Sequence, residues 1–495
     1  MQEGPYQGRG SGGTPYCGAR NIRMVKSVVR QRVLVDIESR RARRFAAITV
    51  IAGFSWLVFL LADGRRGNHH HLVSRSEWLI TLTLVVMLIA RGIYLGRPVS
   101  ARHSMAAMAL LVSGLGLHLM SFRLLGDSLL VAGGAALVWP IGSRPDPELL
   151  PQVWKLIGKT RGDPLAPFAM HSQKSHHFSS DGTAAVAYRA RLGFAVVSGD
   201  PVGRHTAFAD LVVDFAAMCQ SRGWRIMVLG CGENRLALWR DARILGQALT
   251  AIPFGRDVVV EVQRFDMVGR RYRNLRQAVS RTHNRGMTTE LVAERELDAA
   301  VAAELAEVLY ASHRGARWER GFSMILDAAL EGRYPGVLLM IGRERTGRIQ
   351  GFQRYLVAGG GSDVSLDVSW RRPGSPNGID ERLTVDMIEW CKGQGTQRLS
   401  LAFAAFPELF DERQRTSLED FYYRVISLGS LLIRLEALYR YLGKFHALGR
   451  RRYVLVSLRH IPSALVVLLT LEFLPRRRRL AGNPTVQRRQ TLHNT

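Results

Sequence analysis

Cysteine is scarce in this chain of 495 residues. It occurs four times, at Cys17, Cys219, Cys231 and Cys391, and no two of these stand in a CxxC spacing. This pattern argues against a disulfide framework and a cysteine zinc site, and it favours a reducing compartment. The histidine run at 69–71 has no carboxylate cluster around it, which favours an exposed polar loop over a metal site.

Acidic residues are also few. There are 41 Asp and Glu against 68 Lys and Arg, which gives a formal net charge of +27. Such an excess is extreme for a globular enzyme and favours polyanionic partners, either nucleic acid, anionic lipid or both. Residues 1–44 are Gly-rich and then basic, which predicts a disordered tail that ends in a basic segment beside a membrane.

Charge is nearly absent from four apolar stretches, at about 45–62, 78–95, 104–120 and 124–141. Each approaches the roughly 17–25 residues that a helix needs to cross a bilayer, and such runs rarely recur in a soluble domain. The sequence therefore predicts a module of four transmembrane helices at 45–141. The basic flanks predict a multi-pass protein of the cell membrane with its N-terminus and the following domain on the cytoplasmic side.

Prolines punctuate residues 142–174, which we expect to be a linker and amphipathic lead-in to the next domain. Strand-like runs broken by helical patterns then extend from 175 to 456 and predict an α+β domain of about 280 residues, long enough for two fused halves. The helical patterns lie at 211–221, 237–245, 297–313, 382–392 and 428–448, and strand-like runs at 225–229, 257–262, 337–341, 351–357, 364–368 and 399–403. An apolar run at 461–474 is short for a membrane span. We expect it to lie in the bilayer interface or to cover the domain core, within a final segment at 457–495 that ends in a basic tail.

The predicted α+β domain opens on a β-hairpin. Its two alternating segments, 184–190 and 194–198, are bounded by turns that contain Asp181 and Asp200 beside glycines. Asp in such turns serves backbone geometry, so we expect neither residue to be catalytic.

A strongly basic helix is predicted at 268–285. Arginines recur along it, while Tyr272, Leu275 and Val279 form an apolar stripe at helical spacing. The arginines form either a solvated basic face or a surface that binds the phosphates of RNA or lipid headgroups. The net charge of the chain favours phosphate binding.

Two later stretches carry carboxylates with candidate chemistry. WERGFS, at 318–323, contains Glu319, a candidate base or ammonium ligand. In SLDVSWRRPGSPNGIDERL, at 365–383, we expect a strand to end near Asp367 and a helix to begin near Glu381, so that both carboxylates converge over a cleft. Helix capping and compensation of the helix dipole explain the acids at the helix start equally well.

In this order, the stretches resemble motifs of the phosphatidylglycerol lysyltransferases, membrane enzymes that move an aminoacyl group from tRNA to a lipid headgroup. FSSDG…AYR…GDPVG in the hairpin is similar to the entry of their catalytic domain. The run NLRQA, at 274–278, is similar to a run that follows a strand in that family, and WERGFS resembles a W…EKGFS element.

The last of the family's motifs has the pattern DLMR, a spacer, PNG and an acid. Asp367, residues 376–378 and Glu381 match it in spacing. The motif's arginine is replaced by Trp370, and two arginines follow directly, so that its role is either shifted to Arg371 or lost.

The resemblance covers about residues 170–460 and implies a tandem of acetyltransferase-like (GNAT-like) halves. It also implies transfer of an aminoacyl group, lysyl in the first instance, from aminoacyl-tRNA to phosphatidylglycerol. The aminoacyl ester is already activated, so the reaction needs proximity, a proton acceptor and oxyanion stabilisation, but no cofactor, metal or covalent nucleophile.

The candidate catalytic residues are carboxylates that serve as general base or as ligands of the lysyl ammonium group: Asp367, Glu381 and Glu319. Arginine is suited to bind phosphate and a developing oxyanion. The candidate substrate- and phosphate-binding residues are Arg273, Asn274, Arg276, Gln277, Arg371, Arg372 and Ser323.

Two other interpretations stay open. One is a CoA-dependent acyltransferase of GNAT type, which needs a pyrophosphate-binding loop at a helix start; the nearest stretch, RIQGFQ at 348–353, lies at a predicted strand start. The other is a non-catalytic membrane scaffold that binds anionic lipid or RNA. Many family members carry a larger membrane module that flips the product lipid. Four spans are too few for such a module, so we expect no flipping. No synthetase-like stretch is found in the sequence, so we expect another protein to supply the charged tRNA.

Overall fold

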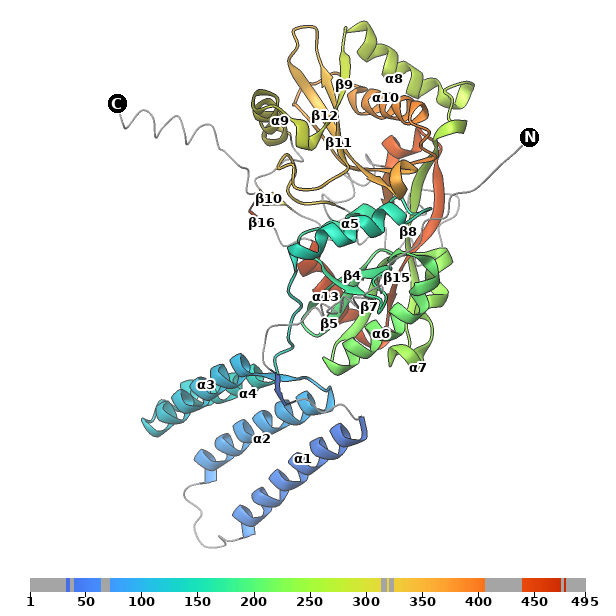
Figure 1. The fold of residues 1–495 in the computed structure, drawn as a ribbon. Helices are drawn as coiled ribbons and strands as arrows, with labels where there is room; N and C mark the ends of the chain where they lie inside the picture. Colours follow the sequence, from blue (N-terminus) through green and yellow to red (C-terminus); the bar gives the residue numbers. More distant parts are fainter. Residues whose placement is uncertain are drawn as a thin grey trace, which may run out of the picture.

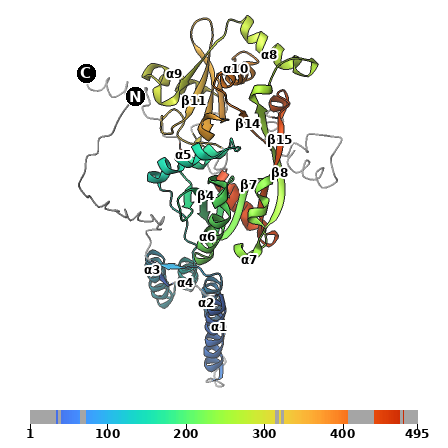
Figure 2. The ribbon, with the colours of Figure 1, turned by 45° about the vertical axis from the view of Figure 1, so that its right-hand side comes forward.

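The computed structural model describes residues 33–35, 40–63, 72–312, 318–319, 325–405, 439–472 and 476–477. In this part of the chain, four helices lie together at one end of the molecule, and a mixed α/β domain built on a long sheet extends from them (Figures 1 and 2).

The four helices occupy the four apolar stretches of the sequence. α1 is long and apolar enough to cross a membrane over Arg41–Phe59, and it is the single candidate span that meets both criteria among the described residues. The four-span module therefore stays a prediction. The helices are α1 Arg40–Asp63, α2 Leu72–Tyr94, α3 Ala101–Leu119 and α4 Arg123–Leu137.

Glycine brings the backbones of α3 and α4 into contact. A Cβ atom added to Gly114 would lie 2.9 Å from the carbonyl oxygen of Gly126, and one added to Gly126 would lie 2.8 Å from that of Gly114. Small residues serve the same purpose between helices in a bilayer. The outward side chains are large and apolar, with Ile80 68%, Met105 73% and Leu124 87% exposed, which suits a hydrocarbon environment better than water.

The domain is organised on one twelve-stranded sheet. Eleven strands follow each other in the order β3-β4-β5-β7-β15-β8-β14-β13-β12-β11-β9, and β6 pairs with β4 at the side. Their bounds are β3 Ser175–Phe178, β4 Ala184–Arg191, β5 Phe194–Ser198, β6 Val202–Gly203, β7 Arg225–Gly232, β8 Thr250–Glu261, β9 Thr288–Ala293, β11 Val337–Arg343, β12 Ile349–Ala358, β13 Asp363–Arg371, β14 Arg398–Ala405 and β15 Leu448–Val456.

The strand order is repeated on the two sides of a central seam. In the first half, the antiparallel pair β4–β5 is followed by α6 (Phe208–Ser221) and by β7, which runs parallel to β5. In the second half, the antiparallel pair β12–β13 is followed by α10 (Ile379–Gly393) and by β14, parallel to β13. The two sides of the sheet thus share one strand order, as expected for the predicted pair of fused halves.

The halves exchange strands at the seam. β8 follows the first half in sequence but pairs with β14 of the second half, whereas β15 follows the second half and pairs with β7 of the first. β8 and β15 also pair with each other. Because each half is completed by a strand from the other side of the chain, the two halves share one continuous sheet.

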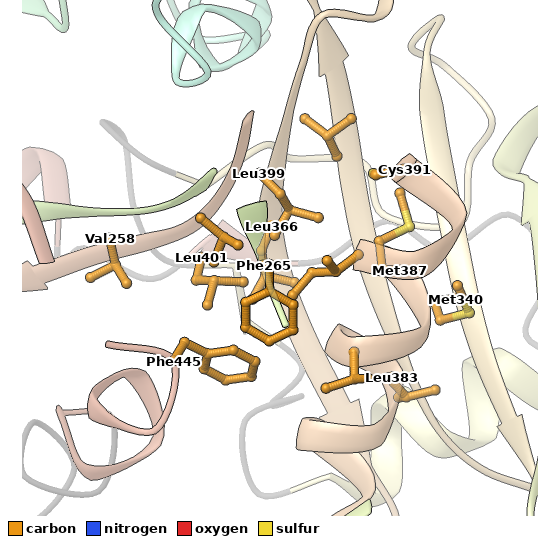
Figure 3. Close-up of a cluster of buried hydrophobic side chains, with 14 of the residues drawn as sticks. Val258, Phe265, Met340, Leu366, Leu383, Met387, Cys391, Leu399, Leu401 and Phe445 are labelled. Carbon is orange, nitrogen blue, oxygen red and sulfur yellow. The ribbon is translucent and has the colours of Figure 1, made fainter. Parts of the chain in front are cut away.

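Helices cover the sheet with apolar side chains at helical spacing. In the second half, Leu383, Met387 and Cys391 of α10 pack on Leu366 and Leu399 of the sheet (Figure 3). In the first half, α6 forms a core with Tyr188, Trp224 and Trp239, and α13 (Ile461–Glu472) covers the opposite face of the sheet through Ala464, Val467 and Leu471. Core coverage, one of the two roles expected for the run at 461–474, is confirmed.

The segment at 142–174, expected to be a linker and amphipathic lead-in, is part of the domain core. It contains α5 (Leu150–Lys159) and the 3-10 helix η3 (Ala166–Met170), and the side chains of Val153 and Ile157 are fully buried. Their core includes Ala185 of the first half and Leu356 of the second. Because this core contains residues of both halves, the segment holds the two halves together.

Some elements differ from the sequence-based expectation. The helix expected at 237–245 is a 3-10 helix, η5 (Glu233–Trp239), followed by the short α7 (Ala242–Leu245). Most of the helix expected at 428–448 lies outside the described residues, and Leu448 begins β15. The remaining elements near the candidate site are η7 Arg270–Tyr272, α8 Arg273–Asn284, α9 Ala299–Ala311, and the short strands β10 Trp318–Glu319 and β16 Arg476–Arg477.

Candidate active site

The PNG loop of the second half leads directly into α10. Gly378, the residue before this helix, has a φ of 101°, a backbone conformation that glycine adopts without strain. A Cβ atom here would lie 2.5 Å from the carbonyl oxygen of Ala278 in α8. Glycine thus allows the start of α10 to approach the basic helix α8 closely.

A buried polar network fixes the start of α10 to β12. The Gln353 side chain donates to the carbonyl oxygen of Asp380 over 3.0 Å and accepts from the hydroxyl groups of Tyr355 at 2.6 Å and Thr384 at 3.1 Å. The hydroxyl groups of Thr384 and Tyr441 are 2.5 Å apart. Burial raises the pKa of both tyrosines, so their phenols stay neutral.

The two acids at the start of α10 face different partners. Asp380 accepts a hydrogen bond from the Ser369 hydroxyl at 2.5 Å and lies 3.7 Å from Nε of Arg371. Glu381 is 8% exposed and forms an ion pair with Lys444, whose side chain is 33% exposed. The predicted placement of Glu381 in the first turn of a helix is confirmed, and its carboxylate is held beside an ammonium group that solvent reaches.

Asp367 lies in a buried ion-pair cluster. Its carboxylate is 3.0 Å from the Arg354 guanidinium, which is also 3.0 Å from Glu294, and all three side chains are fully buried. Asp367 also accepts from the backbone N–H of Leu326 at 3.0 Å. Burial, only partly offset by Arg354, raises the pKa of Asp367 to about 6.

A β-bulge determines which way Asp367 points. The register between β12 and β13 shifts there, since Arg354 pairs with Val368 and Tyr355 pairs with Leu366, which leaves Asp367 as the extra residue. Its partner Arg354 follows Gln353 in β12, and neighbouring strand residues point to opposite faces. Gln353 faces α10, so Asp367 and Glu381 lie on opposite faces of the sheet, and the expected convergence of these two carboxylates is not observed.

The residue that departs from the family motif is part of the core. Trp370 is 4% exposed, and its ring centroid lies 5.0 Å from that of Phe352. Arg372 donates to Glu307 of α9 at 3.1 Å and to the carbonyl oxygen of Ile349 at 2.9 Å, which fastens α9 to the sheet. Arg371 is 47% exposed beside Asp380 and is therefore the arginine of this loop that is open to a ligand.

α8 presents the basic surface predicted for it. Leu275 and Ala278 are buried, whereas Arg273, Asn274 and Gln277 are exposed. Arg276 has a structural role, because its guanidinium donates to the carbonyl oxygens of Met267 and, at 2.9 Å, Gly269. Further exposed cations extend this surface: Arg270, Arg271, Arg281 and Arg285.

The WERGFS stretch is described only in part. Trp318 and Glu319 form β10 and pair with Arg477 and Arg476 of β16. Ser323 lies outside the described residues. The chain is next described at 325, and there the backbone N–H of Leu326 donates to Asp367.

A polar cluster that the sequence did not reveal surrounds Asp327. This carboxylate accepts from the Tyr334 hydroxyl at 2.5 Å, from the backbone N–H and hydroxyl group of Ser172, and lies 3.9 Å from Nδ1 of His171. Burial acts to raise the pKa of Asp327, but His171 and the two hydroxyl donors outweigh it and lower the pKa. No regular spacing connects 171–172 with 327, so only the fold brings them together.

A second unpredicted cluster lies at the seam between the halves. Arg452 of β15 binds Asp257 of β8 with its Nε at 2.9 Å, Asp200 with Nη1 at 2.9 Å, and Asp163 with Nη2 at 3.2 Å. Burial raises the pKa of Asp200 to about 6, against the effect of Arg452. The sequence predicts only a turn role for Asp200, and its partner Arg452 is 252 positions away, so no local pattern indicates this cluster.

Metal-ligating side chains do not gather at the site. Across the described ranges, no group of three or more His, Cys, Asp or Glu side chains is arranged to hold a metal ion. The histidine run at 69–71 lies outside these ranges.

Comparison with known proteins gives consistent matches. Residues 154–456 match the family described as phosphatidylglycerol lysyltransferase, C-terminal. An MprF-like domain protein of Mycobacterium tuberculosis is 56% identical over 451 residues, which cover 91% of this chain and 93% of that protein.

A lysylphosphatidylglycerol biosynthesis bifunctional protein, LysX, of Rhodococcus jostii is 32% identical over 281 residues, which are 56% of this chain and 25% of that protein. Among solved structures, L-PGS from Bacillus licheniformis superposes with a TM-score of 0.55 at 21% identity and covers 68% of this chain and 99% of that one. At this identity the superposition establishes the fold alone.

Proposed function

The chain belongs to the phosphatidylglycerol lysyltransferase C-terminal family, and from this membership we propose that it transfers an aminoacyl group, lysyl in the first instance, from aminoacyl-tRNA to phosphatidylglycerol. The repeated strand order of the two halves supports the finer description of the fold as a tandem of acetyltransferase-like units. The observation that carries the proposal is the contact between the basic helix α8 and the loop that opens α10, because it brings a surface suited to phosphate near the candidate carboxylate Glu381.

The basic surface of α8 is suited to the phosphates of the tRNA donor. Within the described structure, none of its exposed guanidinium groups takes part in an ion pair, so all are available to phosphate. They are those of Arg270, Arg273, Arg281 and Arg285, and that of Arg271, which also lies over the Tyr272 ring at 4.7 Å from its centroid. An arginine outside an ion pair binds a polyanion without first losing a carboxylate partner, and the binding releases counterions from the polyanion.

The proposed reaction is an ester exchange. A hydroxyl oxygen of the lipid glycerol attacks the carbonyl carbon of the aminoacyl ester, a new C–O bond forms, and the bond to the tRNA ribose oxygen breaks. The hydroxyl proton passes through a protein base to the departing ribose oxygen, so atoms and electrons balance without an oxidant or reductant. The protein contributes orientation, the base and stabilisation of the oxyanion.

We assign the proposed roles according to access. Glu381, with Lys444 beside it, serves as base or as ligand of the lysyl ammonium group, and Arg371 stabilises the oxyanion or a phosphate. Glu319 is a further candidate ligand of the ammonium group. Asp367, which is buried against Arg354, acts as a positioning residue through its hydrogen bond to Leu326.

The acceptor lipid requires attachment to a membrane. α1 meets the length and composition of a span, and α2 to α4 carry exposed apolar side chains. We propose that all four helices lie in the cell membrane, with the α/β domain on the cytoplasmic side, where arginines flank the helices.

The test is synthesis of a cationic lipid by the full chain in phosphatidylglycerol bilayers. With lysyl-tRNA we expect lysyl-phosphatidylglycerol, and with Glu381→Gln a loss of about 10²-fold or more in kcat/KM, as expected for removal of a general base. Glu389→Gln is the matched control, because Glu389 lies on the same helix with its side chain 55% exposed.

Two outcomes would contradict the proposal. One is the absence of a tRNA-dependent lipid product with every aminoacyl-tRNA tried. The other is a product that requires acyl-CoA and forms without tRNA, which would identify the chain as a CoA-dependent acyltransferase.

A further inference from the structure

A cavity of about 880 Å³ lies where the helices meet the first half of the domain. This volume is within the roughly 300–1,000 Å³ that is usual for small-molecule sites. Its walls come from the start of α1, the end of α2, the turn between α6 and β7, and the 3-10 helix η11 (Leu458–His460). We call it the junction cavity; its charged or titratable lining residues are Arg43, Arg44, Arg225, Arg459 and His460.

The walls of the junction cavity are held together by direct contacts. The turn residue Gly223 has a φ of +64°, and a Cβ atom there would lie 2.7 Å from the carbonyl oxygen of Gly96, just after α2. Arg43 passes over Gly96 and donates to the carbonyl oxygen of Gln220 at 3.5 Å. The cavity is therefore a fixed part of the fold, since glycine at both positions permits this approach.

Positive charge in and around the junction cavity is not balanced. No carboxylate is among the described residues that line it. Burial and the neighbouring charges of Arg225 and Arg91 lower the pKa of Arg97, and burial together with Arg91 lowers that of Arg225. Nε of Arg97 is buried without a hydrogen-bond partner in the described structure. An anion in the cavity would relieve the repulsion among the cations that line it.

Apolar surface begins at the edge of the junction cavity. Phe45 follows Arg44 in α1 and is 74% exposed, and Tyr94 of the wall is 55% exposed. From η11 onward, Leu458, Leu465 and Leu469 are also exposed, at 59%, 52% and 47%. A ligand that fits both features has an anionic head and apolar chains.

We propose that the junction cavity binds the phosphodiester headgroup of an anionic phospholipid, with the acyl chains along the exposed apolar faces of α1 and α2. The proposal rests on the membrane attachment proposed above and not on the transfer reaction. Figures 1 and 2 place α8 and α10 at the end of the molecule remote from α1 to α4, so this lipid site is separate from the candidate active site.

The experiment measures lipid retained by the full chain after purification in mild detergent, without tRNA. The protein is incubated with phosphatidylglycerol or phosphatidylcholine, washed, and analysed by native mass spectrometry. We expect retention of phosphatidylglycerol over phosphatidylcholine, and at least a tenfold loss of it in the double variant Arg225→Gln/Arg459→Gln. The double variant Arg225→Lys/Arg459→Lys should keep most of the binding, because it keeps the charge.

A matched control removes two exposed arginines elsewhere, Arg240→Gln/Arg348→Gln, and should retain lipid as the unaltered chain does. Should the cavity variant misfold, Arg459→Gln alone, at an exposed position, tests the same prediction.

Equal retention of both lipids, or an unchanged yield in the cavity variants, would overturn the proposal. So would saturable binding of inorganic phosphate or of tRNA at the cavity without retention of phosphatidylglycerol. A failed transfer assay leaves the prediction unaffected, since no donor is present.

Discussion

At the scale of single residues, buried charge in the α/β domain is paired but not fully compensated. The contribution of Asp367 to the stability of the folded chain therefore depends on pH. The pKa of Asp367 is raised to about 6 in the folded chain, from the ordinary value of 3.8. Between these two values the folded state holds a proton that the unfolded state has lost. The free energy of unfolding contributed by this residue therefore falls as the pH rises from about 4 to about 6.

The replacement Asp367→Asn tests this sign. Asn does not titrate, so the stability advantage of the unaltered chain over the variant should shrink as the pH is raised from 4 to 7. Thermal unfolding of both proteins in the same detergent, over that pH series, measures the difference. An advantage that grows with pH would mean that the ion pair with Arg354 outweighs burial, and the pKa would then be lowered.

Prediction from sequence works for single residues where the local chain determines the environment. Glu381 was placed in the first turn of a helix because the PNG loop and the apolar period both mark a helix start there. Trp370 and Asp200 were not understood, since the core around Trp370 includes Phe352 and the partner of Asp200 is Arg452, 252 positions away. Such environments depend on contacts that no local pattern contains.

At the scale of elements, α8 offers a direct test of nucleic-acid binding. Arg273, Arg281 and Arg285 are exposed, and the buried stripe of Leu275 and Ala278 on the other side of the helix keeps it in place. The triple variant Arg273→Gln/Arg281→Gln/Arg285→Gln should weaken tRNA binding and lower the slope of log K against log salt by about 2 to 3, since each lost phosphate contact contributes close to one.

The measurement is fluorescence anisotropy of labelled tRNA between 50 and 200 mM salt, taken as roughly the range in which such contacts are most salt-sensitive. Arg240→Gln/Arg243→Gln/Arg348→Gln removes the same net charge from exposed positions outside α8 and should leave the slope nearly unchanged. Equal effects of the two triple variants would show that net charge, and not this helix, attracts the RNA.

Prediction of elements succeeded for long segments with a clear period and failed for elements defined by distant partners. α6, α9 and α10 and the run β11 to β14 lie close to the expected ranges. The prolines of 142–174 indicate a linker and amphipathic lead-in, but the core of α5 includes residues of both halves, which no local pattern shows. β15 is not predicted from the sequence, and its pairing with β7 and β8 is what makes this basic segment a strand.

At the scale of the whole molecule, the exchange of β8 and β15 makes the seam a point on which both halves depend. Arg452 neutralises carboxylates from three separate parts of the chain there, Asp163, Asp200 and Asp257. Removing one partner of a buried ion pair generally costs about 3–5 kcal/mol, because the remaining charge is left in a poor solvent. The seam should therefore be more sensitive to a single substitution than any surface of either half.

We expect Arg452→Met to destabilise the full chain by about that amount and to do so more strongly at high pH. Burial already raises the pKa values of Asp200 and Asp257, and loss of the guanidinium should raise them further. These two carboxylates can then be neutral near pH 5 but carry uncompensated charge near pH 8. The loss of stability should accordingly be larger at pH 8 than at pH 5, in thermal unfolding of the purified protein.

Arg450→Met, at an exposed position of the same strand, is the control and should have little effect at either pH. The double variant Asp257→Asn/Arg452→Met should recover part of the loss, because one of the stranded charges is gone. A defect independent of pH would point to lost packing of the arginine side chain, and the joining of the halves would then rest on strand pairing and on the core of α5.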